Sequence, residues 1–84
     1  MIIIISIVFS IHSLQKMDAF GIERKEIENV VRKGMKWKED KEDKWHALMN
    51  NIEVVFQKSN EIIFIITVYR GEREKWNALF VIQN

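Results

Sequence analysis

The sequence predicts an α+β domain in which an N-terminal strand and two short helices are followed by an antiparallel meander sheet. Three observations support this fold class. Residues 2–9 form an apolar run rich in β-branched side chains, which is typical of a strand. Ile27, Val30 and Val31 then recur with the spacing of one helix face, and from Trp45 onward the apolar period changes to two.

The length and composition predict one ordered domain that spans residues 1–84. A chain of 84 residues has room for a single modest core, and with 48% hydrophobic residues and no proline it is not a disordered chain. The absence of cysteine excludes disulfides and thiolate sites, which favours a cytoplasmic location. The abundance of isoleucine, lysine and glutamate leans towards the proteome of a thermophilic archaeon or bacterium.

The charge pattern argues against a surface that is basic overall. The formal net charge is +1, so any nucleic-acid site has to be local. Residues 36–44 alternate in sign, and we expect them to form a solvated loop flanked by Trp37 and Trp45.

The apolar N-terminus predicts a strand and no membrane span. It has no basic segment before it and is far shorter than the roughly 20 apolar residues that cross a bilayer. Because residues 2–9 are apolar at nearly every position, we expect a strand that is buried on both faces and ends at Ser10.

Capping residues bound the two expected helices. Ser10 is a plausible N-cap for the first, which Phe20 and Gly21 should end. The second carries Glu26 in its first turn and should end at the C-cap Gly34.

Two turns divide the remaining chain into strands. Asn50-Asn51 predicts a two-residue hairpin turn, and Ser59-Asn60 predicts a second tight turn. Residues 62–69 are apolar on both faces, as in a central strand with helices on one side. Residues 71–84 have both helical and strand spacing, and we expect this tail to pack on the domain.

Residues 12–22 carry a family resemblance. They read His-Ser-Leu-Gln-Lys-Met-Asp-Ala-Phe-Gly-Ile, which resembles, at identical spacing, the His-Ala-x-x-Arg-Met-x-x-Arg-Gly-Ile-Ser signature of a family of small domains of unknown function. That family looks related to the RelE/ParE-type toxins of toxin–antitoxin pairs, and the likeness covers about residues 3–70. The sequence departs from the signature at Lys16 and Phe20, where the family prefers arginine, and at Glu23, where it prefers serine.

The resemblance implies a toxin-like ribonuclease that needs no metal or other cofactor. Such an enzyme requires a base, an acid and cations around the phosphate. The catalytic candidates are His46, Arg70 and His12, and the candidates for RNA binding are Lys44, Lys16 and Tyr69. The implied partners are mRNA or the ribosome, and a small antitoxin that would cover the sheet face or an exposed edge strand.

A non-enzymatic role has its own support in the same residues. His12 also suits a helix cap, and Arg70 could pair with Glu72 or Glu74. His46 lies on the opposite strand face from Trp45 and is either solvent-facing or part of a sheet-face site. The alternative function is therefore an interaction module, of which a homodimer is one form, that keeps the fold and has lost the active site. Zinc-binding spacing and a phosphate-binding loop are both absent from the sequence.

Overall fold

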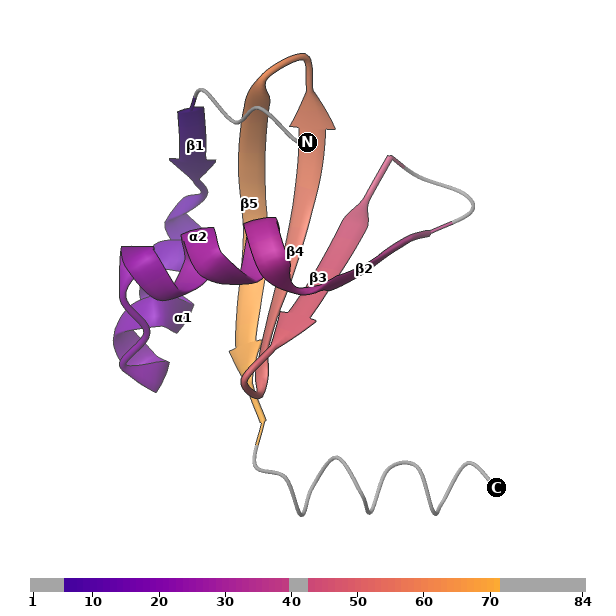
Figure 1. Cartoon of the computed structure of the whole chain (residues 1–84). Coiled ribbons are helices and arrows are strands. Elements are labelled where there is room, and N and C mark those ends of the chain that lie inside the picture. The colour runs from indigo at the N-terminus through magenta and orange to yellow at the C-terminus, as the bar shows by residue number, and fades with distance from the viewer. Residues whose placement is uncertain (1–5, 40–42, 72–84) are drawn as a thin grey trace.

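The computed structural model describes residues 6–39 and 43–71, which form two helices and one five-stranded mixed sheet. The elements in chain order are β1 (Ser6–Phe9), α1 (Ile11–Phe20), α2 (Arg24–Lys33), β2 (Met35–Lys38), β3 (Trp45–Met49), β4 (Ile52–Ser59) and β5 (Ile62–Arg70). In space the strands follow the order β1-β5-β4-β3-β2, with β1 parallel to β5 and the other pairs antiparallel (Figure 1). The predicted α+β class is confirmed, and the sheet is mixed rather than purely antiparallel.

The first strand differs from its prediction. β1 has one neighbour in the sheet, β5, and its Ser6 and Val8 side chains are exposed while Ile7 and Phe9 pack against the core. The expectation of a strand buried on both faces was therefore wrong, because an apolar run can also supply an edge strand with one open side. Residues 1–5 lie outside the described part of the chain.

Helix α1 begins at the predicted cap and is tied to the sheet there. The Ser10 side-chain oxygen accepts a hydrogen bond from the Ser13 backbone N–H at 3.0 Å and donates one to the Ile66 carbonyl at 2.8 Å. The buried Ser13 hydroxyl donates in turn to the Ser10 carbonyl. Gly21 ends the helix in the left-handed conformation, with φ of 66°. One cap therefore starts α1 and fixes it against β5.

Helix α2 supplies the helical side of the core. Its Ile27, Val30 and Val31 side chains are buried, as their spacing predicted. Gly34 ends the helix, but with φ of −69° it is not left-handed. A methyl group there would lie 2.5 Å from the Val30 carbonyl oxygen and 2.8 Å from that of Leu48. Glycine is therefore required because the backbone of β3 passes close to the helix end.

Strand β2 corrects the first part of the loop that was predicted for residues 36–44. Residues 36–38 lie in the strand, whereas Glu39, Asp43 and Lys44 lie outside the strands as predicted, and residues 40–42 are outside the described part of the chain. Met35–Lys38 pairs antiparallel with β3, and Trp37 lies opposite His46. The sequence Met-Lys-Trp-Lys alternates apolar and basic side chains with a period of two, but the strand is only four residues long and lies at the sheet edge. Charge alternation was therefore a misleading indicator of a loop here.

The predicted hairpin between β3 and β4 is confirmed. Asn50 and Asn51 both have positive φ, 54° and 65°, and Met49 pairs with Ile52 across the turn, as in a type I′ hairpin. The second turn lies one residue later than predicted, because β4 continues through Ser59 and Asn60 adopts the positive φ.

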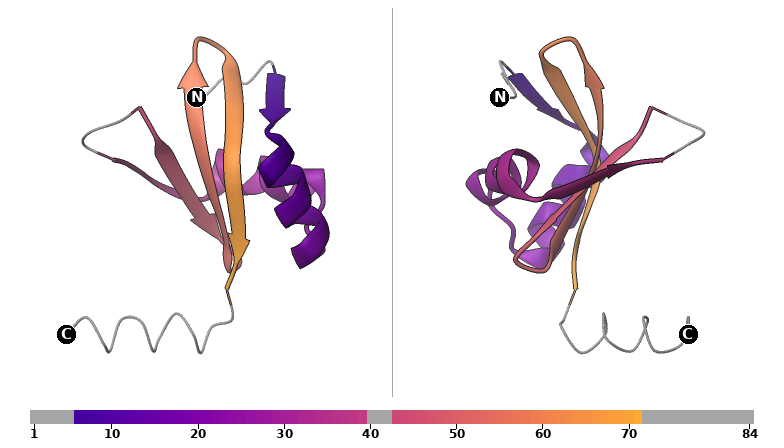
Figure 2. Two further views of the ribbon diagram at one scale, coloured as in Figure 1. Left: turned by 180° about the vertical axis from the view of Figure 1, so that it is seen from behind. Right: turned by 45° about the vertical axis from the view of Figure 1, so that its right-hand side comes forward.

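The core lies between α2 and one face of the sheet. Ala47, Val54 and Val68 are fully buried side by side on β3, β4 and β5. Helix α2 crosses this face, whereas α1 lies beside β5, below β1 (Figure 2). No helix in the described ranges is long and apolar enough to span a membrane. The predicted tail lies outside those ranges.

Candidate interaction face and histidine cluster

The face of the sheet opposite α2, which we call the open face, carries alternate residues of every strand. Because side chains alternate along a strand, the residues between the buried positions point to this face. One row across it contains Met35, Leu48, Glu53 and Tyr69, and the next contains Trp37, His46, Val55 and Thr67. The view from behind shows no described helix across β3, β4 or β5 on this side (Figure 2).

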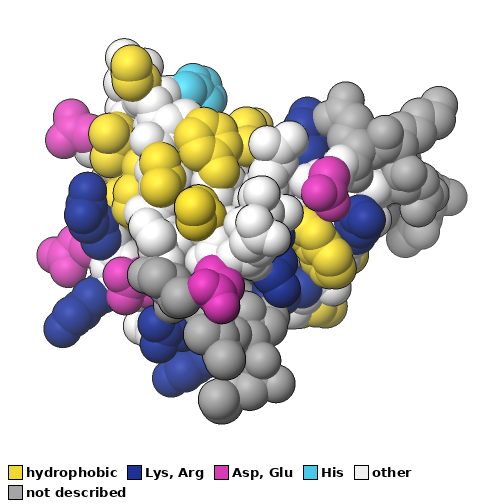
Figure 3. Space-filling model, turned by 90° about the horizontal axis from the view of Figure 1, so that it is seen from above, with side chains coloured by type: hydrophobic (Ala, Val, Ile, Leu, Met, Phe, Trp, Pro, Cys, Tyr) yellow, Lys and Arg dark blue, Asp and Glu magenta, His cyan; other side chains and the backbone are white. Residues whose placement is uncertain are grey.

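The open face exposes several large apolar side chains. Six large apolar side chains that are between 38% and 66% exposed lie on it: Val8, Met35, Trp37, Ile62, Phe64 and Tyr69. Seen from above, hydrophobic side chains gather in one group at this end of the molecule, with charged side chains to the left and right of it and across the lower part of the view (Figure 3). The six side chains form one group on β1 and β5, which contains Val8, Ile62 and Phe64, and another on the opposite edge strand β2, which contains Met35 and Trp37. Exposed apolar groups of this kind can mark interaction sites.

His46 forms the polar centre of the open face. Its Nδ1 lies 2.8 Å from Glu53 Oε2, and its Nε2 lies 2.5 Å from Glu39 Oε1. Trp37 stacks on the imidazole from the neighbouring strand. A neutral imidazole has one N–H, so only the doubly protonated ring donates to both carboxylates at once. The arrangement therefore favours the imidazolium.

The two carboxylates also decide the direction of the pKa shift. Burial alone would lower the pKa of His46, but the hydrogen bonds and negative charges of Glu39 and Glu53 outweigh it and raise the pKa above its ordinary value. A protonated histidine between two carboxylates is a poor general base. A phosphate would also meet the two negative charges as it approached. The geometry thus suits a structural or recognition role better than phosphate chemistry.

Arg70 is not near His46. It pairs with Ile52 on the helix-covered face, and its Nη2 donates to Glu26 Oε2 of α2 at 2.7 Å. His46 shares its row with Thr67, so its Cα and that of Arg70 are separated by about 10 Å along the strands and about 10 Å across them, with side chains on opposite faces. The sequence had suggested Glu72 or Glu74 as partners of Arg70, and both lie outside the described residues.

Two other predicted residues do come together at the open face. The Lys16 ammonium lies 5.9 Å from the ring centre of Tyr69 and 5.7 Å from that of Phe20. His12 is exposed one helical turn before Lys16, on the same side of α1. Lys44 directly precedes β3, and its carbonyl accepts a hydrogen bond from the Glu39 backbone N–H.

The sequence did not indicate Glu39, Glu53 or Trp37 as partners of His46. The contact between Glu53 and His46 could have been predicted from the Asn50-Asn51 turn. That turn sets the register in which Leu48 pairs with Glu53, and this register places Glu53 diagonally across from His46 on the same face. Glu39 and Trp37 depend on β2, which was missed. Within residues 6–39 and 43–71, no group of three His, Cys, Asp or Glu side chains is placed to hold a metal ion.

Comparison with known proteins gives one family and no individual relative. The family model described as a domain of unknown function, DUF4258, matches residues 9–70. No curated protein and no solved structure matches the chain.

Proposed function

The chain belongs to the DUF4258 family of domains of unknown function, and we propose that it is a protein-interaction module that forms a homodimer through the open face of its sheet. The observation that carries the proposal is the set of six exposed apolar side chains on that face. Their removal from water is the driving force for association.

Charge complementarity favours a second copy as the occupant. Glu39 and Glu53 lie on the β3 side of the open face and leave it acidic in either protonation state of His46, which they flank. Lys16 lies at the other side, beside Tyr69 of β5. A twofold axis in the plane of the face, parallel to the strands, exchanges these two sides. Lys16 of each copy then faces the acidic side of the other.

The size of the open face sets the affinity that we expect for the dimer. The five strands contain 4, 4, 5, 8 and 9 residues, and at the usual strand spacing and rise they give a surface of roughly 500 Å² per copy. A dimer would bury about 1,000 Å² in total, which is at the low end for specific interfaces. The dimer should therefore depend on protein concentration rather than be permanent.

Sedimentation velocity of the full chain over a wide concentration range tests the dimer. The key variant is Met35→Lys, which places a charge on the most exposed apolar residue of the open face. Its matched control is Ile11→Lys, since Ile11 is 77% exposed on the side of α1 turned away from Ser13 and Lys16. We expect a dimer that Met35→Lys weakens by about tenfold or more and that Ile11→Lys leaves unchanged. A monomer at every concentration, or a dimer equally strong in Met35→Lys, overturns the proposal.

A toxin-like ribonuclease, neutralised by a small antitoxin on the same face, is the second candidate. Its support is the RelE/ParE-like signature at residues 12–22 and the placement of His46 and Tyr69 on one face with Lys16 at its border. The test is translation of a reporter mRNA with mapping of RNA ends, comparing His46→Ala with Arg70→Ala. Cleavage that only His46→Ala loses supports this function, because Arg70 lies on the other face. Intact RNA with the folded protein excludes it.

A further inference from the structure

The first strand leaves one edge of its backbone unpaired. β1 is the terminal strand of the sheet, and no described element lies beyond it on the side away from β5 (Figure 1). In the parallel pairing of the two strands, the backbone N–H groups of Ser6 and Ser10 donate to carbonyls of the β5 side. Backbone groups alternate in direction along a strand, so the N–H and C=O of Ile7 and Phe9 point away from the sheet. The edge therefore offers these donors and acceptors to an added strand.

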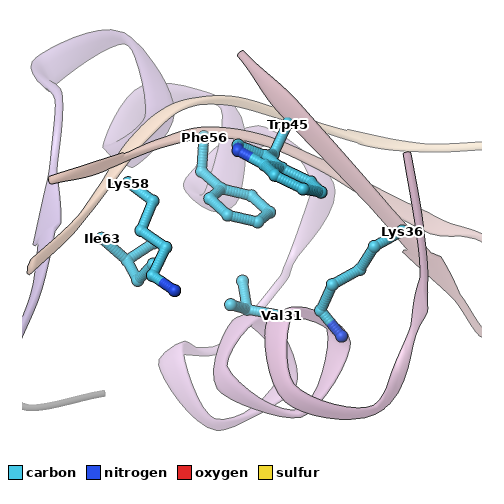
Figure 4. A pocket seen from close by; sticks show the side chains of 6 residues that line it. All are labelled: Val31, Lys36, Trp45, Phe56, Lys58 and Ile63. Carbon is cyan, nitrogen blue, oxygen red and sulfur yellow. The ribbon is translucent and has the colours of Figure 1, made fainter. Parts of the chain in front are cut away.

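The opposite edge of the sheet is protected in a way that β1 is not. Just beyond β2, the N–H of Glu39 donates to the Lys44 carbonyl and continues the pairing with β3. By the same alternation, the outward backbone groups of β2 belong to Lys36 and Lys38. The Lys36 side chain extends to the end of α2, where its ammonium group binds two carbonyls (Figure 4). Lysine on an edge strand hinders the addition of another strand, whereas β1, with the sequence Ser-Ile-Val-Phe, carries no charge and no proline.

Apolar side chains flank the free edge of β1 on both faces of the sheet. On the open face, Val8 is 44% exposed, and Phe64, its partner on β5, is 38% exposed. On the helix-covered face, Ile7 and Phe9 are partly buried against the core. Because the side chains of an added strand alternate between the two faces, they meet an apolar neighbour on each of them.

One cation lies at this edge. The Arg24 guanidinium of α2 is 5.1 Å from the centre of the Phe9 ring, and its side chain makes no ion pair or hydrogen bond within the residues that the structure describes. On an added strand, the residue opposite Phe9 has its Cβ about 5 Å from that of Phe9, on the same face. A glutamate at that position is within reach of the guanidinium, which forms strong hydrogen bonds with carboxylates.

We infer that the free edge of β1 binds an extended apolar segment of a partner protein, which adds antiparallel to β1 and carries an acidic residue opposite Phe9. In that orientation Ile7 and Phe9 each exchange both main-chain hydrogen bonds with the residue opposite, and these about four bonds supply the attachment. The apolar neighbours and Arg24 select the sequence of the segment. A short segment held in this way should have a dissociation constant on the order of 1 mM. The proposed dimer uses the open face of the sheet and does not pair this edge.

The test is titration of the full chain with the peptide acetyl-Thr-Glu-Val-Ile-Thr-amide, followed through the backbone amides of Ile7, Val8 and Phe9 in nitrogen-15 correlation spectra. One control peptide carries N-methyl groups on its Glu and Ile, which retains the side chains and removes the N–H groups that would face β1. A second control peptide has glutamine in place of the glutamate. The protein variants are Arg24→Gln and, as the matched control, Lys25→Gln on the exposed surface of α2.

We expect saturable shifts at the Ile7 and Phe9 amides, with hydrogen exchange at both slowed in the complex. The N-methylated peptide should bind at least about tenfold more weakly. The glutamine peptide should bind about twofold to fivefold more weakly, and Arg24→Gln should remove this difference whereas Lys25→Gln should retain it.

Three results would each overturn the inference. One is that the Ile7 and Phe9 amides do not respond to the peptide, or that in the free protein they already exchange as slowly as the Val8 amide, which the pairing with β5 protects. Another is equal binding of the N-methylated peptide. The third is a preference for glutamate that persists in Arg24→Gln. Because Met35 lies on the opposite edge strand, Met35→Lys should bind the peptide normally, which separates this test from that of the dimer.

Discussion

Trp37 stacks on His46 with ring centres 5.0 Å apart and ring planes only 7° from parallel. The contact joins two neighbouring strands, since the two residues are directly opposite in the β2–β3 pairing. A cation over an indole face is attracted to the ring electrons, and His46 is the cation that Glu39 and Glu53 hold in place. The stacked histidine therefore fastens the edge strand β2 to the sheet, and its protonation strengthens the contact.

Stability should fall as the pH rises through the titration of His46. The folded-state pKa of His46 is raised, so the folded protein holds this proton more tightly than the unfolded chain does. The stabilisation is complete below the unfolded pKa of about 6.5 and is lost as the pH passes the raised folded pKa. Urea unfolding from about pH 6 to about pH 9 measures the slope. His46→Gln should remove this part of the slope, and His12→Gln, a change on exposed α1 surface, should retain it.

Replacing Glu53 by glutamine should lower the pKa of His46. Glu53 contributes both a hydrogen bond and a negative charge to the imidazolium, and glutamine removes the charge. Titration of the His46 ring protons by nuclear magnetic resonance measures the change. Glu61→Gln, in the exposed β4–β5 turn, is the matched control and should leave the titration of His46 where it was. An unaltered pKa in Glu53→Gln would contradict the assigned contact.

Gly34→Ala should destabilise the protein more than Gly21→Ala does. At Gly34 the added methyl group meets two backbone carbonyls that cannot rotate away, and such overpacking costs about 1–3 kcal/mol. At Gly21 there is open space, and the cost is the left-handed conformation alone, about 1 kcal/mol. Urea unfolding of both variants gives the two differences in the free energy of unfolding. The reverse order would show that the backbone separates more easily at Gly34 than its position implies.

The Arg70–Glu26 pair should contribute little to stability. Both side chains are more than a third exposed, and pairs of this kind contribute about 0.5 kcal/mol or less after screening by solvent. A double-mutant cycle with Arg70→Ala and Glu26→Ala isolates the coupling energy from the other effects of each change. A coupling well above 1 kcal/mol would mean that the pair is held rigidly, and that Arg70 matters to the docking of α2.

Thr67→Val should be neutral or slightly stabilising. Thr67 is buried on β5, and within the described residues its hydroxyl oxygen has no hydrogen-bond partner. Valine has nearly the same shape and places no polar atom there, so the change removes a burial cost of up to about 1 kcal/mol. Thermal unfolding checks the sign. A clear loss of stability in Thr67→Val would show that a bound water or ligand normally satisfies the hydroxyl.

Local signals in the sequence predicted local features well. Ser10 as a cap, Gly21 as a left-handed stop and Asn50-Asn51 as a hairpin turn each follow from the chemistry of one or two residues, and the structure confirms them. The α+β class followed from the change of apolar period. By contrast, the edge position of β1 and the strand β2 depend on which strands are neighbours, and no local pattern contains that information.

The candidate site was also predicted only as far as local sequence patterns allow. His46 was placed on the correct strand face because the period of two requires it. The sequence grouped His46 with Arg70 because both residues lie on strands. Along β5, however, Arg70 is three residues beyond Thr67, which lies in the same row as His46. Because three is an odd number of residues, the Arg70 side chain points to the opposite face of the sheet. A site built across strands is predictable only when the register is known.

The parallel pairing of β1 with β5 has a consequence for how the protein folds during its synthesis on the ribosome. The hydrogen bond from Ser10 to Ile66 spans 56 positions of sequence, and β1 has no other strand neighbour in the described chain. During synthesis the helices and the β3–β4 hairpin can form from nearby residues, whereas β1 must wait for β5 to emerge. A nascent chain stopped before residue 62 would therefore present an unpaired apolar strand, which is the state that chaperones recognise and in which aggregation begins.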